Sequence, residues 1–128
     1  MCRLLIVDDH TVVRHWLKQW LGDLFPDWEF EEAENGRIGV EMALLHEPDA
    51  VLMDISMPVM DGLEATELIS QSVGSVPVIV MTLHTAPEYR DRAYEAGAAG
   101  FVRKDRVDDE LIPMLEAVMG EKQSLNGV

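Results

Sequence analysis

The sequence predicts one α/β domain built on a doubly wound, five-stranded parallel β-sheet with helices on both faces. Short runs of consecutive apolar residues, typical of strands buried on both faces, alternate with longer segments whose apolar residues recur at helical spacing. This alternation of strand and helix occurs five times along the chain. Strands and helices that alternate in this way form parallel sheets through right-handed crossovers.

The first unit begins with an apolar strand at residues 4–7, Leu-Leu-Ile-Val, which ends abruptly at Asp8-Asp9. The helix that follows has one apolar stripe at positions i, i+3, i+4, i+7 and i+8, formed by Val13, Trp16, Leu17, Trp20 and Leu21. Gly22 and then Pro26 are expected to end this helix. The stripe predicts that both tryptophans lie wholly or partly in the core rather than at an interface.

The second and third units repeat this order of strand, turn and helix. In the second strand Glu29 and Glu31 alternate with Phe30, whereas the third strand is apolar throughout and ends on Asp54. The predicted strands are residues 28–33 and 50–53, and the predicted helices are residues 38–45 and 63–70. Dipeptides typical of turns separate these elements: Asn35-Gly36, Pro48-Asp49 and Asp61-Gly62.

The fourth unit has an apolar strand at residues 76–81 that ends on Thr82. Residues 85–88, Thr-Ala-Pro-Glu, have the form of a capping box with proline in the first turn. The helix that they open is expected to run to about Ala96, where Gly97 can cap it.

The fifth unit starts with a short strand at residues 100–102. Asp108 or Asp109 is predicted to cap a last helix that runs to Met119. Pro113 is expected to be tolerable only near the first turn of that helix, because proline removes one helical hydrogen bond.

The composition excludes several classes of protein. The chain has 128 residues, 48% of them hydrophobic, which suits one domain at residues 1–120, with 121–128 as a tail or the start of a linker. A net charge of −14 argues against direct binding to nucleic acid and fits a bound cation or a basic partner. Cys2 is the only cysteine, so no disulfide can form within the chain. Without a signal segment or a membrane-spanning run, a cytoplasmic protein is expected.

Four of the predicted strands end on side chains suited to chemistry: Asp8-Asp9, Asp54, Thr82 and Lys104. The carboxyl ends of parallel strands lie at one edge of a sheet, so we expect these side chains to meet in one pocket. Three carboxylates at close quarters repel one another, and Mg²⁺, which prefers oxygen ligands, would relieve that repulsion. A carboxylate beside such a cation can attack phosphorus, while a lysine and a hydroxyl bind the phosphoryl oxygens.

Each of these residues also has an ordinary structural interpretation. Taken alone, an aspartate after an apolar strand is more often a turn or cap residue than a catalytic group, and Asp9 in particular could cap the first helix. Caps and turns do not require this combination of residue types at four strand ends. The combination therefore favours a functional site.

Five short motifs occur in a fixed order: Leu-Leu-Ile-Val-Asp-Asp at 4–9, Met-Asp-Ile-Ser-Met-Pro at 53–58, Asp-Gly at 61–62, Thr82, and Gly-Phe-Val-Arg-Lys at 100–104. Together they resemble the receiver domains of two-component response regulators, over almost the whole chain from Leu4 to about Met119. Asp105 follows the lysine where many receivers have a cis-proline, which is similar to receivers attached to LuxR/NarL-type DNA-binding domains. The resemblance implies the flavodoxin-like receiver fold with strand order 2-1-3-4-5.

The resemblance also implies roles for the matching acidic residues. Asp54 matches the phosphoacceptor. Asp9 matches the direct ligand of Mg²⁺, and Asp8 matches its neighbour that holds metal-bound water. The backbone carbonyl of Ser56, two residues after Asp54, matches a further metal ligand.

The remaining matches concern phosphate binding and switching. Lys104 matches the phosphate-binding lysine, and Thr82 and Phe101 match the hydroxyl and aromatic positions whose movement repacks the face of helix four, strand five and helix five. Leu83 is larger than the small residue of many receivers and is predicted to narrow access to the phosphoryl group. His84 lies next at the pocket rim, where it either contacts the phosphoryl group or is simply an exposed histidine.

The sequence therefore predicts a signalling switch rather than an enzyme. The expected phosphodonor is a sensor histidine kinase or a phosphotransfer protein, and the expected cofactor is Mg²⁺. The expected output is transcription, through a DNA-binding domain that is not part of this chain. A homodimer through helix four, strand five and helix five is a further hypothesis, and no direct contact with nucleic acid or membrane is expected.

Three alternatives involve the same residues. A phosphatase of the haloacid-dehalogenase type would need an Asp-x-Asp pattern after the first strand, which Asp8-Asp9 does not fit. A flavin-binding module would need a phosphate loop rich in Ser, Thr and Gly at that place, and no dinucleotide or Walker loop is present either. A degenerate receiver that only binds partners is disfavoured by the intact acidic pair, Asp54, Thr82 and Lys104.

Overall fold

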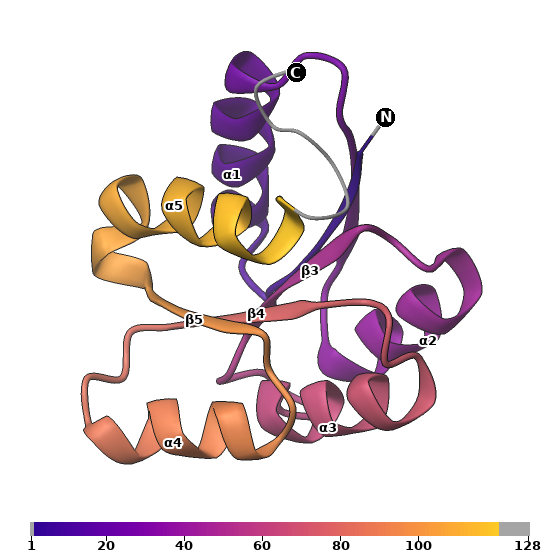
Figure 1. Cartoon of the computed structure of the whole chain (residues 1–128), viewed down its shortest axis with the longest axis vertical. Helices are drawn as coiled ribbons and strands as arrows, with labels where there is room; N and C mark the ends of the chain where they lie inside the picture. Colours follow the sequence, from indigo (N-terminus) through magenta and orange to yellow (C-terminus); the bar gives the residue numbers. More distant parts are fainter. Residues whose placement is uncertain (1, 121–128) are drawn as a thin grey trace.

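The computed structural model describes residues 2–120 and shows a five-stranded parallel sheet in the order β2-β1-β3-β4-β5 (Figure 1). The predicted fold class and strand order are confirmed, whereas the predicted tail at 121–128 lies outside the described residues. The strands are β1 Arg3–Val7, β2 Glu29–Ala33, β3 Ala50–Asp54, β4 Val78–Thr82 and β5 Gly100–Arg103. The helices are α1 Thr11–Leu24, α2 Gly36–His46, α3 Gly62–Ser72, α4 Pro87–Glu95 and α5 Val107–Met119, with a 3₁₀ turn η1 at Lys104–Arg106 before α5.

Helices cover both faces of the sheet, α1 and α5 on one side and α2, α3 and α4 on the other (Figure 1). Successive strand residues point to opposite faces, so each apolar strand supplies both layers of the core. In β1, for example, Leu4 and Ile6 pack with Leu17 of α1 and Leu115 of α5, while Leu5 packs in the layer on the other side. Burial on both faces explains why these strands read as continuous apolar runs.

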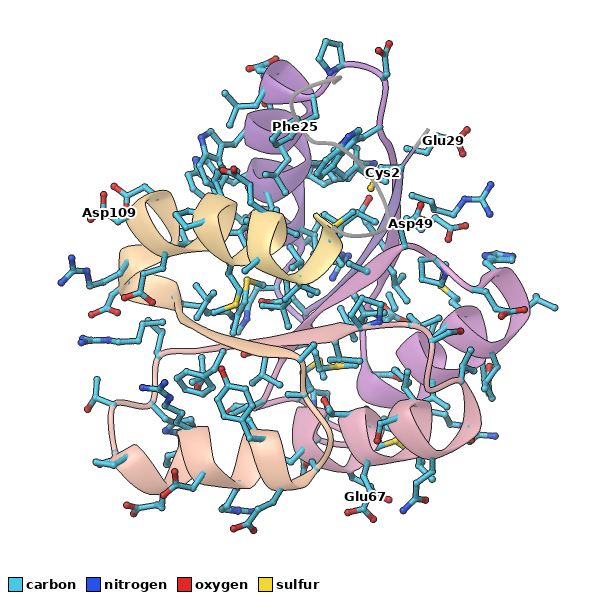
Figure 2. The ribbon with its side chains drawn as sticks, in the orientation of Figure 1. Cys2, Phe25, Glu29, Asp49, Glu67 and Asp109 are labelled. Atoms are coloured by element: carbon cyan, nitrogen blue, oxygen red, sulfur yellow. The ribbon has the colours of Figure 1, made fainter. Side chains whose placement is uncertain are left out.

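The acidic residues lie mostly on the outside of this fold. Figure 2 shows Glu29, Glu67 and Asp109 pointing away from the body of the domain. Among the described residues, Asp8 and Asp54 are the only acidic residues that are buried as a whole, with 0% and 4% of their surface exposed. The surface therefore carries most of the negative charge, and these two buried acids need local compensation. Within residues 2–120, no helix is both long and apolar enough to cross a membrane.

The helix starts depart in part from the sequence prediction. Asp61 caps α3, since its Oδ1 accepts from the backbone N–H of Glu64 at 2.9 Å. The capping box predicted for α4 is wrong, because Ala86 is the N-cap residue and no side chain caps the helix. Pro87 at the first helical position, whose φ is already helical and which has no N–H to satisfy, starts α4 in its place.

The start of α5 also differs from the prediction. The helix begins at Val107 directly after η1, so Asp108 and Asp109 lie inside its first turn and do not cap it. Their negative carboxylates still interact favourably with the positive end of the helix dipole. Pro113 is the seventh residue of α5, well past the first turn, which the sequence analysis did not expect. It lies on the exposed side, where water can satisfy the carbonyl group that loses its hydrogen bond.

Trp16 is more exposed than its place in the apolar stripe predicted. Leu17 and Leu21 form the buried side of α1, and the helix continues through Gly22 to Leu24. Trp16 lies at the margin with 48% of its surface exposed and stacks on the partly buried Trp20, with ring centroids 5.2 Å apart. Trp16 therefore does not belong to the buried side of α1.

Gly62, the first residue of α3, lies against the end of β3. A Cβ atom at this position would overlap the backbone carbonyl oxygen of Asp54, and the Gly62 N–H donates to the carbonyl of Ile55 at 2.8 Å. Backbone cannot move aside as a flexible side chain can. The absence of a side chain at Gly62 thus allows the loop after β3 to fold back close to Asp54.

We expect Gly62→Ala to lower the free energy of unfolding by about 1–3 kcal/mol, the usual cost of inserting a methyl group into a packed site. Gly22→Ala is the matched control, because its Cβ would only make an ordinary contact with Phe30 at 3.7 Å and alanine favours helix by up to about 1 kcal/mol. Urea unfolding followed by circular dichroism measures both. Equal stability of Gly62→Ala and the wild type would contradict the close approach.

Candidate functional site

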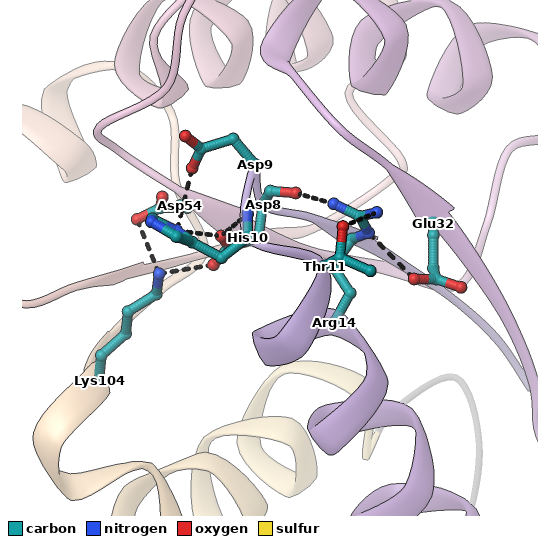
Figure 3. A network of polar contacts seen from close by, with 8 residues as sticks. All are labelled: Asp8, Asp9, His10, Thr11, Arg14, Glu32, Asp54 and Lys104. Atoms are coloured by element: carbon teal, nitrogen blue, oxygen red, sulfur yellow. Dashed lines mark hydrogen bonds and ion pairs between the residues drawn. The ribbon is translucent and has the colours of Figure 1, made fainter.

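The side chains predicted to converge do meet at the carboxyl edge of the sheet, meaning the edge where the strands end. Asp8 follows β1, Asp54 ends β3, Thr82 ends β4 and Lys104 follows β5. These strands are neighbours in the order β1-β3-β4-β5, so the topology brings together residues that are up to 96 positions apart. Figure 3 shows the acidic residues and the lysine at this edge.

Lys104 is held between the two buried carboxylates. Its Nζ donates to Asp8 Oδ2 at 2.5 Å and lies 3.2 Å from Asp54 Oδ1 (Figure 3). Burial by itself would lower the pKa of Lys104, but the hydrogen bond to Asp8 and the charges of both carboxylates outweigh it and raise the pKa above its ordinary value. The lysine is therefore a permanent cation at the centre of the site.

Asp54 is nearly enclosed, with 4% of its surface exposed. Burial raises the pKa of its carboxyl group, Lys104 opposes this shift, and the neighbouring charges of Asp8 and Asp9 add to it, so that the pKa lies above the ordinary value. The positive charge of Lys104 thus only partly compensates the negative charges of the three carboxylates. A second cation would reduce their remaining repulsion.

The acidic cluster has the donor set that such a cation needs. One ligand atom each from Asp8, Asp9, His10 and Asp54 lies within 4.8 Å of the others. Asp9 Oδ1 is buried and accepts no hydrogen bond from the described residues. A carboxylate oxygen that is buried yet accepts no hydrogen bond, beside two further carboxylates, fits a hard divalent cation such as Mg²⁺.

The alternative role of Asp9 as a helix cap is not realised. The N-cap residue of α1 is His10, and no side chain makes a capping hydrogen bond there. The ring Nδ1 of His10 instead lies 3.1 Å from Asp8 Oδ1 and 3.2 Å from Asp9 Oδ1. Asp9 therefore does not cap α1.

Thr82 and Phe101 lie on the neighbouring strands β4 and β5, on the same face of the sheet. Thr82 is 1% exposed, and its Oγ1 accepts from the backbone N–H of His84 at 3.0 Å, which leaves its own hydroxyl hydrogen available to donate. Phe101 is partly buried against the core and borders a hollow of about 360 Å³ next to α4 and α5, together with Tyr94 and Met114.

The two predicted modulators of access lie on different sides of the site. Leu83 is 68% exposed and borders an apolar hollow beside α1, which Lys104 also lines. His84 is exposed, as one of the two interpretations of the sequence expected, and its Nε2 lies 2.8 Å from the hydroxyl of Ser56. Ser56 and Asp9 line the same open pocket.

Sequence reasoning missed two residues that organise the site. His10 donates its backbone N–H to Asp8 Oδ1 at 2.9 Å, and Arg14 donates to the backbone carbonyl of Asp8 at 2.6 Å while pairing with Glu32 at 2.9 Å (Figure 3). Both lie close after the acidic pair in the sequence, but no spacing rule distinguishes them from other polar residues at the start of a helix.

The raised pKa of Asp54 predicts how stability depends on pH. In the folded state the group holds its proton more tightly than in the unfolded state, so its contribution to stability is complete below the ordinary value of 3.8 and is lost as pH rises through the folded-state pKa. Without added Mg²⁺, Asp54→Asn should therefore have a higher melting temperature than the wild type at neutral pH. The increase should be roughly 4 °C for each kcal/mol of unfolding free energy regained.

This difference should shrink as pH falls towards 3.8. Asp27→Asn, a change at an exposed aspartate, is the control and should shift the melting temperature little. A wild type that melts above Asp54→Asn at neutral pH without Mg²⁺ would show that ionised Asp54 stabilises the fold.

Several known proteins resemble this chain in sequence. Residues 4–116 match the family model described as "Response regulator receiver domain". The chain is 36% identical over 118 residues to the response regulator UvrY of Escherichia coli, covering 92% of this chain and 54% of UvrY. It is 37% identical over 119 residues to the transcriptional regulatory protein YdfI of Bacillus subtilis, covering 93% of this chain and 55% of YdfI. The chain thus spans about half the length of these relatives.

Solved structures show the same fold. A two-component response regulator of the LuxR family from Aurantimonas superposes with a TM-score of 0.87 at 30% identity, covering 96% of this chain and 88% of that one. The response regulator TrrA from Thermotoga maritima, solved in complex with Mg²⁺-BeF, superposes with a TM-score of 0.82 at 30% identity, covering 92% of this chain and 99% of that one. With the family model matching most of its length, this chain belongs to the receiver domains of two-component response regulators.

Proposed function

We propose that this receiver domain accepts a phosphoryl group on Asp54 in a reaction that requires Mg²⁺. The observation that carries the proposal is the position of Lys104, which contacts both Asp54 and Asp8. Beside them lies an Asp9 oxygen that accepts no hydrogen bond. A nucleophilic carboxylate, a fixed ammonium group and an unsatisfied acidic pair are the parts that phosphoryl transfer to a carboxylate needs.

In the proposed reaction an Oδ atom of Asp54 attacks the phosphorus of the donor. The new O–P bond forms as the bond from phosphorus to the donor's leaving group breaks. A histidine leaving group takes the electron pair of the N–P bond and one proton from solvent, and departs as a neutral imidazole. Lys104 pairs with the phosphoryl oxygens, and the Thr82 hydroxyl donates a hydrogen bond to one of them. Slow hydrolysis reverses the switch, since attack by water releases inorganic phosphate and restores the Asp54 carboxylate.

The acidic pair and the loop after β3 would hold the cation. Asp9 and Asp54 are proposed as direct carboxylate ligands, Asp8 as the residue that binds metal-bound water, and the backbone carbonyl of Ser56 as a further ligand. When bound, Mg²⁺ would neutralise negative charge on the transferring group and its acceptor. Ser56 and Asp9 line one open pocket of about 460 Å³, which leaves room for a hydrated ion.

The proposed output is a change of packing on the face formed by α4, β5 and α5. Thr82 would move towards the phosphoryl group, and Phe101 would follow into the space that Thr82 leaves. Shifting such an equilibrium from 1:99 to 99:1 requires about 5.5 kcal/mol of differential stabilisation. A new charged group in contact with Lys104 and a cation, in a largely buried site, is a suitable source of that energy.

The proposed partners follow from the family. A sensor histidine kinase or a phosphotransfer protein would supply the phosphoryl group. This transfer would take place in the cytoplasm, where transcription, the proposed output, occurs. YdfI is named as a transcriptional regulatory protein, so we propose that this receiver controls transcription through a DNA-binding domain. The negative charge of this chain is unfavourable for DNA contacts of its own.

Incubation with acetyl phosphate and Mg²⁺ should add one phosphoryl group to the wild type, as measured by the mass of the intact protein. No adduct should form without Mg²⁺ or in Asp54→Asn, and Asp9→Asn should slow formation at least tenfold because a metal ligand is lost. Asp49→Asn, a change at an aspartate that caps the start of β1, is the matched control and should react like the wild type. An adduct of unchanged yield in Asp54→Asn would refute the assignment of the acceptor.

Phosphorylation should also promote a homodimer through the face of α4, β5 and α5. Light scattering over a range of protein concentrations should show a higher mean molar mass for the phosphorylated domain than for the unmodified one. The charge reversal Arg103→Glu, at a partly exposed residue of β5, should weaken that increase. A molar mass that stays the same with phosphorylation at every concentration would count against this interface.

A further inference from the structure

The side chain of His10 reaches into the acidic cluster from the start of α1. Its ring Nδ1 lies 3.1 Å from Asp8 Oδ1 and 3.2 Å from Asp9 Oδ1 (Figure 3). The side chain is 66% exposed, yet this nitrogen faces two carboxylates, one of which is completely buried. His10 makes no side-chain capping hydrogen bond to α1, so the start of the helix does not account for the position of the ring.

The distances around this nitrogen fit the coordination sphere of a small metal ion. Four tetrahedral ligands at about 2.0–2.2 Å from a Zn²⁺ ion lie roughly 3.3–3.6 Å from one another, and adjacent ligands of an octahedral Mg²⁺ lie roughly 2.9 Å apart. The separations of 3.1 Å and 3.2 Å at Nδ1 fall between these values. The ligand atom of Asp54 lies within 4.8 Å of the other three, so side-chain rotation can bring it into the same sphere.

An imidazole nitrogen changes which cations the cluster prefers. Mg²⁺ is a hard ion that prefers oxygen ligands and keeps several of its waters, whereas Zn²⁺ and its neighbours in the first transition series bind imidazole readily. Carboxylates together with an imidazole are a donor set for ions of the second kind. Asp9 Oδ1, which is buried and accepts no hydrogen bond, lies directly beside the nitrogen and completes the pair of donors.

We propose that His10 is a nitrogen ligand of the cation site, so that the site binds a late first-row transition-metal ion such as Zn²⁺ more tightly than Mg²⁺. The ligands are His10 Nδ1 and one carboxylate oxygen each from Asp8, Asp9 and Asp54. When the ion binds, any hydrogen on Nδ1 leaves to solvent and the nitrogen donates its lone pair to the metal. This inference rests on the cation site of the proposed function, which gives His10 no part.

A transition-metal ion held in this way opposes phosphorylation. Four protein ligands close a tetrahedral site, which leaves no position for a phosphoryl oxygen. The carboxylate of Asp54 donates electrons to the ion and becomes a weaker nucleophile. Zn²⁺ therefore competes with Mg²⁺ and slows the modification of Asp54, and His10 determines how strongly the site discriminates between the two ions.

Metal binding can be measured without any phosphoryl transfer. Isothermal titration calorimetry gives the affinities of the whole chain for Zn²⁺ and for Mg²⁺ in the wild type, His10→Asn and His15→Asn. Asparagine at position 10 keeps an N–H that can donate to Asp8, but its amide nitrogen is only a donor and cannot bind a metal ion. His15→Asn is the matched control, because His15 is also an exposed histidine of α1.

His10→Asn should weaken Zn²⁺ binding by at least about tenfold, the loss seen even for residues that only support a metal ligand. Its affinity for Mg²⁺ should change much less, because Mg²⁺ prefers oxygen ligands. His15→Asn should bind both ions like the wild type. Equal Zn²⁺ affinities of His10→Asn and the wild type would overturn the proposal. Equal losses of Zn²⁺ and Mg²⁺ binding would also overturn it, because His10 would then only support the carboxylates.

NMR of the histidine ring nitrogens identifies the ligand directly. The chain has 4 histidines, and Zn²⁺ should shift the Nδ1 signal of His10 while those of His15, His46 and His84 stay in place. Coordination changes the chemical shift of the bound nitrogen itself, which a hydrogen bond to a neighbouring carboxylate does not reproduce. A Zn²⁺-dependent shift confined to another histidine would contradict the assignment.

Phosphorylation by acetyl phosphate in the presence of Mg²⁺ separates the two proposals. Zn²⁺ should slow formation of the adduct, and the same inhibition of His10→Asn should need at least about tenfold more Zn²⁺. A Mg²⁺-dependent adduct with equal Zn²⁺ affinities of wild type and His10→Asn supports the proposed function and overturns the role of His10. Zn²⁺ binding that depends on His10, without an adduct under any condition, supports the role of His10 and counts against the proposed function.

Discussion

The ammonium group of Lys104, held between the buried carboxylates of Asp8 and Asp54, is the interaction on which the rest of the site depends. Two carboxylates at the end of adjacent strands would repel each other if no cation lay between them. Lys104 comes from the far end of the chain, and only the parallel order β1-β3-β4-β5 brings it to this edge. The fold thus supplies a positive charge that residues nearby in the sequence do not. The remaining negative charge, with an Asp9 oxygen that is buried and accepts no hydrogen bond, favours a divalent cation.

The contacts around the site continue to the surface of the domain. Thr82 accepts from the backbone of His84, and His84 stacks on Tyr89 of α4. A hydroxyl that moves towards a phosphoryl group would therefore release the backbone of a residue that contacts α4 directly. Phe101 of β5 borders the hollow beside α4 and α5, which His84 also lines. Both routes lead to α4, which covers the same face of the sheet as α3 (Figure 1).

Much of this architecture could be predicted because it depends on patterns that a sequence displays directly. Continuous apolar strands such as residues 4–7 predicted a sheet buried on both faces, and polar residues at the strand ends predicted where the site lies. Features that depend on tertiary geometry could not be predicted in this way. The capping box predicted at residues 85–88 does not form, and Pro87 starts the helix instead. Trp16 lies at the margin of the core because packing sets the rotation of the helix about its axis. The contact of Ser56 with His84 joins two loops 28 residues apart, and no spacing rule indicates it.

The central claim is that Asp54, Lys104, Thr82 and the acidic pair form one phosphoryl and metal site. A crystal structure of this chain with Mg²⁺ and beryllofluoride, the combination bound in the Thermotoga maritima relative, tests it directly. We predict beryllofluoride on Asp54, with Lys104 and the Thr82 hydroxyl on its fluorine atoms and the cation on Asp9 and Asp54. Beryllofluoride on another carboxylate, or a cation bound away from Asp9 while Lys104 keeps both of its present contacts, would contradict the account.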